Sequence, residues 1–489
     1  MSKKIISVLT FLSFLLVFSA VRAQNATDVL RNSLQYPSYD PVTIVMPGTA
    51  YATGFGAYQE NPAVMALFDE SFFSGGLSDR YVSEKGMYLG NRSSFDVNAL
   101  GIADVGLVYK MPTQRGSLVI GGGYSQTTGF NRALSGFGFN DETTLTDSYV
   151  TTPDDDLFFA ALDAFAIDFI TPEQNYDETA SIFRADSPYK GIHQTFELTE
   201  KGVSGEYSLF FATELFKNFN VGVSIGAIAG TYSYRRDFIE IDKKQNYETQ
   251  FKDEQGNLIG IDNILNEDTI EANFTGFSGR VGILYQVTPH FNIGAGYQFA
   301  NIIFIDEEFN TIITNTLDDG SDYREDAPGH IKYKIKRPAR LQLGIALKNI
   351  SGFTFTGSIE NVAYSDARIR FDDIRNAELE NSINKQVKKN LTNANNLRLG
   401  LEYKINDILT PRIGYGYYPS PIENKNADRQ FYSAGFTAQM THEVALSVGV
   451  QYAVWDDETT IYSSSYGDER MNEDVNRWNI MAGFTYYFE

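Results

Sequence analysis

WNIMAGFTYYF, the sequence of residues 478–488, alternates between two kinds of side chain. One face carries Trp478, Ile480, Ala482, Phe484, Tyr486 and Phe488, and the other carries Asn479, Met481, Gly483, Thr485 and Tyr487. A period of two residues predicts a β-strand whose two faces meet different surroundings. The same alternation recurs over residues 339–347, 397–404 and 443–454. Strands of one kind are therefore repeated along the chain.

Each of these segments is about ten residues long, which is the length that crosses a bilayer at the tilt of a β-barrel. Aromatic residues gather toward the segment ends, as the two interfaces of a membrane favour. A soluble β-sandwich also alternates, although its strands average nearer six residues, and it remains the alternative fold. We predict an all-β chain that forms an antiparallel transmembrane barrel.

The connections between the predicted strands alternate between short and long. Outer-membrane barrels have short periplasmic turns and long extracellular loops. Six short turns, with a first strand near residues 72–83 and a last one ending at Phe488, give about fourteen strands. The short connections lie near residues 110–116, 216–220, 288–290, 349–352, 406–410 and 441–442, and the long ones are 127–205, 239–270, 305–330 and 365–395.

Two of the long connections carry helix signals. Thr152, Pro153 and the acids Asp154–Asp156 form a strong helix start, because a capping hydroxyl, proline and early acids all favour a helix N-terminus. We predict that this helix runs to Ile170 and, being apolar nearly all round, either packs within the loops or receives an apolar ligand. Residues 376–392 predict a second, more polar helix.

The first residues predict export. Lys3 and Lys4 precede an uncharged run from Ile5 to Ser19, and Val21-Arg22-Ala23 supplies a cleavage site before Gln24. This is the layout of a signal peptide, and the run is shorter than the ~20 residues that an anchoring helix needs. We therefore predict a signal peptide over residues 1–23, a plug over 24–71 and the barrel over 72–489, in the outer membrane.

Composition excludes several functions. Removing the signal peptide changes the net charge from −22 to −25, which opposes nucleic-acid binding because phosphates need clustered lysine and arginine. The acids fall mostly between strands, where they are solvated or, alternatively, bind divalent cations. Cysteine is absent, and the four histidines have no metal-ligand spacing. No catalytic motif appears, so we predict no enzyme, no metal and no cofactor.

The segment before the first strand carries a group of motifs. They are Asp28-Val29-Leu30-Arg31, Gly48-Thr49-Ala50, Gly54-Phe55-Gly56-Ala57 and Asn61-Pro62-Ala63, followed by Tyr88-Leu89-Gly90-Asn91 and Gly121-Gly122-Gly123-Tyr124. Over about the first 130 residues the chain resembles the FadL/TodX family of outer-membrane transporters for long-chain fatty acids and other hydrophobic compounds, and most of all its Bacteroidetes-type members. Tyr58-Gln59-Glu60 departs from the small or apolar residues expected there.

The resemblance implies a monomeric barrel of fourteen strands with an N-terminal hatch that contains Asn61, Pro62 and Ala63. It also implies passive capture of a hydrophobic ligand at the extracellular face and sideways release through a gap at the third strand. We place that strand at 117–126, with Gly121, Gly122 and Gly123 at its centre. Glycines tolerate bulges and close backbone approach, and the alternative is a patch of small residues that makes room for the plug.

A carboxylated ligand would need a cation beside apolar walls. The candidates are Arg280, Arg340, Arg398 and Lys334. Each arginine could instead form a salt bridge to a lumenal acid such as Glu402 or Asp104, and the row that contains Lys334 could instead bind phosphates of lipopolysaccharide. The predicted function is passive transport of hydrophobic molecules with a fatty acid as the default ligand, and the alternative is a closed barrel with a structural or surface-interaction role.

Overall fold

The computed structural model describes residues 25–36, 40–151, 155–170, 175–176, 178–185, 188–248, 251–252 and 258–488. The predicted signal peptide lies outside these residues. Among them, no helix is both long enough and apolar enough to cross a membrane.

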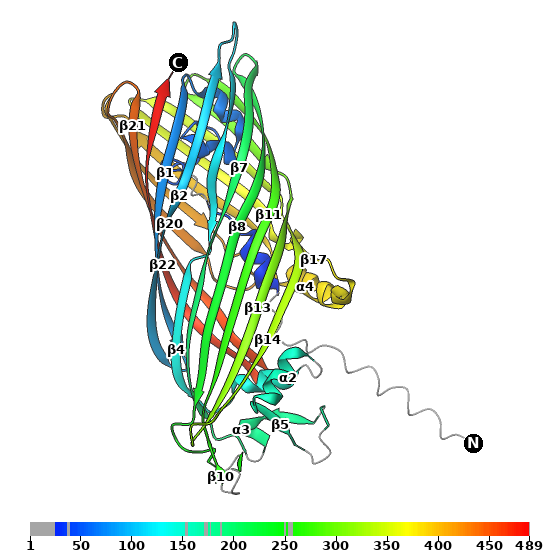
Figure 1. Cartoon of the computed structure of the whole chain (residues 1–489). Coiled ribbons are helices and arrows are strands. Elements are labelled where there is room, and N and C mark those ends of the chain that lie inside the picture. The colour runs from blue at the N-terminus through cyan, green and yellow to red at the C-terminus, as the bar shows by residue number, and fades with distance from the viewer. Residues whose placement is uncertain are drawn as a thin grey trace, which may run out of the picture.

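Fourteen antiparallel strands close into a barrel, as predicted (Figure 1). The strands are β1 (Ser71–Tyr88), β2 (Asn91–Met111), β3 (Leu118–Gly129) with β4 (Arg132–Asn140), β7 (Ile192–Phe216), β8 (Phe219–Ile241), β11 (Ile261–Thr288), β12 (Phe291–Gln298) with β13 (Asn301–Leu317), β14 (Asp322–Arg337) with β15 (Arg340–Ile350), β16 (Phe353–Ala363) with β17 (Arg368–Phe371), β18 (Asn393–Tyr403), β19 (Leu409–Tyr418), β20 (Arg429–Gln439), β21 (Val444–Ser464) and β22 (Gly467–Phe488). The last strand pairs with the first, from Ser71 opposite Phe488 to Met87 opposite Asn472. Closure leaves no strand edge exposed to lipid at this seam.

The alternation that predicts the strands also gives their orientation. In β22, Trp478, Ile480 and Phe484 are exposed on the outer face, while Met481 is fully buried in the lumen. The six predicted short connections all join strands at one end of the barrel. We take that end as periplasmic, because outer-membrane barrels have their short turns there.

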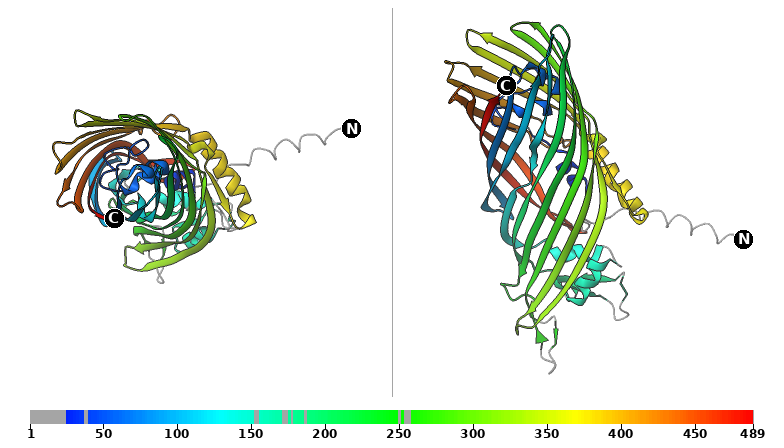
Figure 2. Two further views of the ribbon diagram at one scale, coloured as in Figure 1. Left: turned by 90° about the horizontal axis from the view of Figure 1, so that it is seen from above. Right: turned by 45° about the horizontal axis from the view of Figure 1, so that its top comes forward.

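Most strands are longer than the predicted ten residues, and β11 has 28. The predicted long connection 239–270 is mostly strand, and 305–330 is a hairpin of β13 and β14 that turns at residues 318–321. The barrel wall continues beyond the bilayer on the extracellular side. There, outward residues such as Glu271 are polar, while inward residues such as Ile264 are buried in a hydrophobic core that includes residues of the β4–β7 connection. Strands β16 and β18 to β20 have only 10 or 11 residues, so the extracellular rim is low on that side (Figure 2).

The long connection between β4 and β7 folds into a cap at the extracellular end. It contains the 3-10 helix η3 (Leu145–Thr151), the helices α2 (Asp156–Asp163) and α3 (Ile182–Ala185) and the short strands β5 (Ile167–Phe169) and β6 (Thr179–Ser181). The predicted helix is wrong at its end, because Phe165 adopts a positive φ of 53° and the chain then enters β5. Its predicted start at Thr152 lies outside the described residues. The next long connection holds a small hairpin of β9 (Phe251–Lys252) and β10 (Leu258–Ile259).

The second predicted helix is confirmed as α4 (Ala377–Asn390), which the 3-10 helices η4 (Tyr364–Asp366) and η5 (Ile374–Asn376) precede. It lies beside β17, on the extracellular side of the low rim; the extracellular end points down in Figure 1. Ile383 and Val387 are buried on the face that packs into the core shared with the N-terminal helix α1 (Ala26–Ser33). The amphipathic α4 thus completes the wall where β18 is too short to do so.

Residues that precede β1 fill part of the lumen, and we refer to the described residues 25–70 as the hatch (Figure 1). Besides α1, the hatch contains the 3-10 helices η1 (Phe55–Gln59) and η2 (Pro62–Leu67). η2 contacts β7, β8 and β11. Tyr58, Ala63 and Met65 are fully buried in a core shared with the barrel wall.

Candidate functional site

Asn61, Pro62 and Ala63 join the hatch to the barrel wall. The Asn61 side-chain amide donates to the carbonyl oxygens of Thr49 at 2.7 Å and of Ile283 in β11 at 3.0 Å, and its oxygen caps η2 by accepting from the Ala63 amide. A Cβ atom at Gly282 would lie 1.8 Å from the Asn61 side-chain oxygen, so only glycine allows this approach. The structure therefore places this motif as an anchor between hatch and wall.

Glu60, which departs from the expected pattern, makes the second attachment of the hatch. Its carboxylate is buried, pairs with Arg398 of β18 and accepts from the Gly48 amide at 2.8 Å and the Thr49 hydroxyl at 3.1 Å. The Arg398 guanidinium also donates to the carbonyl oxygen of Thr43. Arg398 thus holds the hatch in this structure.

The other candidate cations are also paired. Arg280 forms a two-pronged pair with Glu206 at 2.6 and 2.9 Å, and Arg340 pairs with Glu360 at 3.2 Å and donates to the Ser33 carbonyl at 2.7 Å. The two acids suggested from the sequence contact other residues: Glu402 pairs with Arg412, and Asp104 accepts from the Ser74 hydroxyl.

Lys334 does not point into the lumen. It lies on the outer face of β14, opposite in phase to the buried Tyr333 and Ile335, and pairs with Asp372 at 2.6 Å. In the sequence, lysines alternate with apolar residues at positions 332, 334 and 336. This pattern alone fits lysines on either the lumenal or the outer face of the strand. The register of β14 with β13 and β17 places them on the outer face.

Gly121, Gly122 and Gly123 lie in β3 where it is still paired with β2. A Cβ atom at Gly123 would lie 2.1 Å from the Val105 carbonyl oxygen and 2.9 Å from the ring of Phe55 in the hatch. Gly106, which faces Gly123 across the pair, would place a Cβ 2.2 Å from the same ring. The glycines make room for the hatch and bring the third strand close to it.

The wall opens just beyond these glycines. The pairing of β2 with β3 ends at Asp104 opposite Ser125, and β4 pairs with β7 but not with β2. Strand three bends inward here, since a Cβ atom at Gly129 would lie 1.8 Å from the inward-facing guanidinium of Arg80. A cavity of about 960 Å³ occupies this position and is lined by outward residues such as Leu100 and Leu209 together with the inward Arg80. We call this opening the wall gap.

A second cavity, of about 270 Å³, lies inside the barrel, and we call it the lumenal pocket. Its apolar lining includes Leu30, Leu34, Val82, Phe130, Ile422 and Val475. Its lining also includes Arg429 of β20 and Arg477 of β22, which stack on the same two rings: Arg429 lies 5.1 Å from Tyr36 and 5.0 Å from Trp455, and Arg477 lies 5.3 and 5.6 Å from them. The pocket therefore places two stacked arginines beside apolar side chains, within a lining that also contains other charged residues.

These two arginines differ from three other cations that line the pocket. Arg31 pairs with Asp28, Arg132 is held among Glu84, Glu200 and Glu473, and Lys425 pairs with Asp457. Within the part of the chain that the structure describes, neither Arg429 nor Arg477 forms an ion pair. Sequence reasoning missed them, although the alternation of β22 puts Arg477 on the same lumenal face as Asn479 and Met481 and could have found it.

The lumenal pocket and the wall gap adjoin, because Arg80 and Asn131 line both. Residues of the connection 419–428, above the low rim, line the opposite side of the pocket. The geometry thus joins the low side of the extracellular rim, a cationic apolar pocket and an opening toward the lipid.

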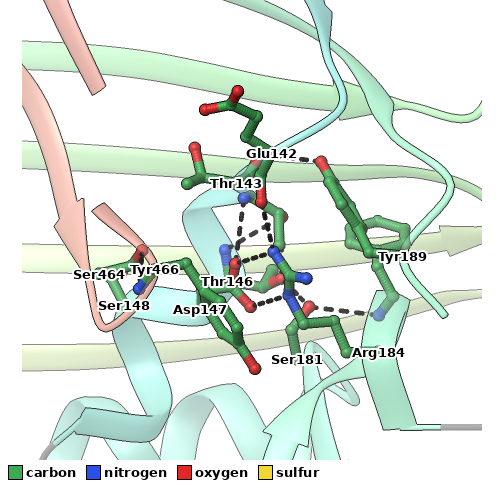
Figure 3. A network of polar contacts seen from close by, with 12 residues as sticks. Glu142, Thr143, Thr146, Asp147, Ser148, Ser181, Arg184, Tyr189, Ser464 and Tyr466 are labelled. Atoms are coloured by element: carbon green, nitrogen blue, oxygen red, sulfur yellow. Dashed lines mark hydrogen bonds and ion pairs between the residues drawn. The ribbon is translucent and has the colours of Figure 1, made fainter. Parts of the chain in front are cut away.

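Arg184 of α3 ties parts of the cap to one another and contacts the barrel rim (Figure 3). Its guanidinium donates to both carboxylate oxygens of Asp147 at 2.7 and 2.8 Å and to the Glu142 carbonyl at 2.7 Å. It stacks 4.3 Å from the ring of Tyr189 and 3.9 Å from that of Tyr466, at the tip of the β21–β22 hairpin. Burial raises the pKa of Asp147, while Arg184 opposes that shift.

The fold is similar to that of solved barrels described as transporters. The toluene transporter TodX of Pseudomonas putida matches with a TM-score of 0.54 and 14% identity over 93% of this chain and 99% of that one. A FadL homologue of Pseudomonas aeruginosa matches with a TM-score of 0.55 and 13% identity over 94% and 100% of the two chains. No curated protein sequence matches the chain.

The model of the outer membrane transport protein family OMPP1/FadL/TodX matches residues 205–488, and the chain belongs to this family. The match confirms the family resemblance, although it covers the second half of the chain rather than the first 130 residues that suggested it. The family consists of transporters of the bacterial outer membrane for hydrophobic compounds.

Proposed function

We propose that this barrel is a passive, non-catalytic channel for long-chain carboxylated lipids, such as fatty acids, and that it releases them sideways into the membrane. The observation that carries the proposal is the lumenal pocket with its two arginines and its neighbour, the wall gap. A guanidinium binds a carboxylate through two parallel hydrogen bonds. The apolar lining suits the acyl chain.

The ligand would arrive over the low rim between β18 and β20 and bind with its carboxylate at Arg429 and Arg477. Its acyl chain would then lie along Leu34 and Phe130 toward the wall gap. The hatch blocks the straight path to the periplasm, because Asn61 and Glu60 attach it to the wall. Release through the wall gap needs no energy source, since burying the acyl chain in the bilayer is itself favourable.

Obstruction of the wall gap provides the test. Gly101 of β2 lines it, and a Cβ atom there meets nothing nearer than 3.8 Å. Gly101→Phe should therefore fold and fill the opening. Gly279→Phe is the matched control, because Gly279 lies in β11, away from the gap, and its nearest neighbour would be 3.7 Å away.

The readout is uptake of labelled oleate by cells that lack other fatty-acid transporters and express each variant. We expect Gly101→Phe to reduce uptake toward the level of cells without the protein and Gly279→Phe to leave it unchanged. Equal uptake by both variants would contradict sideways release. No uptake by the unmodified protein would instead favour the alternative, a barrel with a structural or surface-interaction role.

A further inference from the structure

Five cationic side chains form a compact patch on the outer surface of the barrel. Lys332, Lys334 and Lys336 alternate along the outer face of β14, and register places Arg370 directly opposite Lys334 and Arg368 directly opposite Lys336 on β17. We call these five residues the outer basic patch. A cluster of this kind stands out in a chain whose net charge is −22.

The height of the patch fits the outer boundary of the bilayer. Below it on the same strand, Leu341, Leu343, Ile345 and Leu347 of β15 all face the lipid. Leu347 lies eleven positions after Lys336 in the sequence. At a rise of ~3.3 Å per residue and a tilt of ~40°, these eleven steps correspond to about 28 Å of height. The lipid-facing band of such barrels is about 25 Å tall, so Lys336 lies at its outer edge and Lys334 and Lys332 lie just above.

Nearby acids neutralise only part of the patch. Lys332 pairs with Asp306 at 2.7 Å and Lys334 with Asp372 at 2.6 Å. Arg368 donates to the backbone carbonyls of Ser365 and Ala367. Among the described residues, Lys336 and Arg370 form no ion pair, and both are exposed.

Like charges that face each other across a strand pair destabilise a sheet. Two such pairs, Lys334 with Arg370 and Lys336 with Arg368, lie side by side. An anion held between them would turn this repulsion into attraction, and phosphate oxygens accept several charge-assisted hydrogen bonds from guanidinium and ammonium groups.

We propose that the outer basic patch binds the phosphate groups of lipid A, the lipopolysaccharide anchor that forms the outer leaflet around the barrel. Its acyl chains would descend along the apolar outer face of β15, and Ile302 and Phe304 of β13, directly opposite Lys336 and Lys334, would flank their upper ends. This lipid is bound outside the barrel, so the site is separate from the lumenal pocket and does not depend on transport.

The test uses the variant Lys336→Gln/Arg370→Gln, which removes the two cations without an ion pair and leaves the lumen untouched. The control Lys217→Gln/Lys404→Gln removes two exposed cations near the periplasmic end. The purified, delipidated barrel in detergent micelles is titrated with diphosphoryl lipid A and, separately, with lipid A stripped of phosphate, phosphatidylglycerol or inorganic phosphate. Binding is followed by native mass spectrometry.

We expect the unmodified protein and the control to bind diphosphoryl lipid A equally, and the patch variant to bind it about tenfold more weakly, since charge-assisted hydrogen bonds are lost. The unmodified protein should bind lipid A without phosphate only weakly. This affinity should equal that of the patch variant for diphosphoryl lipid A. Unchanged affinity in the patch variant, or an equal loss in the control, would overturn the proposal. Equal binding of phosphatidylglycerol, or displacement of lipid A by millimolar inorganic phosphate, would also overturn it.

Discussion

At the scale of single residues, the lumenal pocket depends on how Tyr36 and Trp455 hold two arginines of like charge close together. Each guanidinium stacks on both rings, and cation–π contact stabilises a cation without consuming its hydrogen-bond donors. The donors of Arg429 and Arg477 can therefore serve a ligand. In Arg280, Arg340 and Arg398 a carboxylate of the protein already occupies them.

This arrangement predicts selective loss of carboxylate binding. Arg429→Gln and Arg477→Gln should each raise the Kd for a long-chain fatty acid about tenfold or more, because a hydrogen bond to a charged group contributes roughly 1.5–3 kcal/mol. Fluorescent fatty-acid titration of the purified barrel measures this. The methyl ester of the same acid should bind all variants alike, and Arg235→Gln, on the exposed outer surface, should bind the acid normally. Equal losses for acid and ester would show that the arginines only shape the pocket.

Glu60 gives a second prediction at this scale. Glu60→Ala leaves Arg398 buried without its carboxylate and removes the acceptor of Gly48 and Thr49. Breaking a buried pair on one side costs about 3–5 kcal/mol, which should loosen the hatch while the barrel stays closed. Swelling of proteoliposomes in a small sugar should therefore be faster for Glu60→Ala than for Glu423→Ala, an exposed acid in the 419–428 connection. Equal swelling rates would show that other contacts are sufficient to hold the hatch.

Elements show what a period of two can predict and what it cannot. Because lipid and lumen differ, the alternation in β22 or β15 reveals the strand, its faces and, with the turns, the strand count. The wall gap is invisible to this reasoning, since Gly121 to Gly123 remain paired and the break depends on the third strand leaving β2 beyond Ser125 while it stays paired with β7. Likewise, the end of α2 is set by the fold of the cap, where Phe165 packs 4.7 Å from Tyr323 of β14, and not by a proline or glycine in the sequence.

The cap is an element whose attachment can be tested. Arg184 joins η3, Tyr189 and the β21–β22 hairpin (Figure 3), so Arg184→Leu should loosen the cap, although Glu240 of β8 still accepts from Thr144 and Leu145. Amide hydrogen exchange over residues 142–151 and 178–185 should become about tenfold faster or more, which corresponds to the loss of roughly 1.5–3 kcal/mol of charge-assisted bonding. Arg184→Lys should have an intermediate effect because one charge remains, and exchange in β20 should not change. Uniform acceleration across all strands would indicate destabilisation of the whole barrel instead.

For the whole molecule, the question is whether the hatch must move for ligand to pass. The chain has no cysteine, so two introduced cysteines can form a disulfide within the chain only with each other. A Cβ atom at Gly400 of β18 would lie 2.9 Å from Cγ of Met46 in the hatch. A disulfide needs a similar spacing of about 3 Å between one sulfur and the partner Cβ, given its S–S bond of ~2.05 Å. Met46→Cys/Gly400→Cys should therefore lock hatch to wall when oxidised.

Release through the wall gap requires no displacement of the hatch, whereas passage to the periplasm along the barrel axis does. We expect oleate uptake by the oxidised double variant to equal uptake after reduction, with each single cysteine variant as control. A block on oxidation that reducing agent reverses would mean that ligand passes through the hatch. Combined with Gly101→Phe, the lock separates the two routes: a sideways path is sensitive only to the filled gap, and an axial path only to the locked hatch.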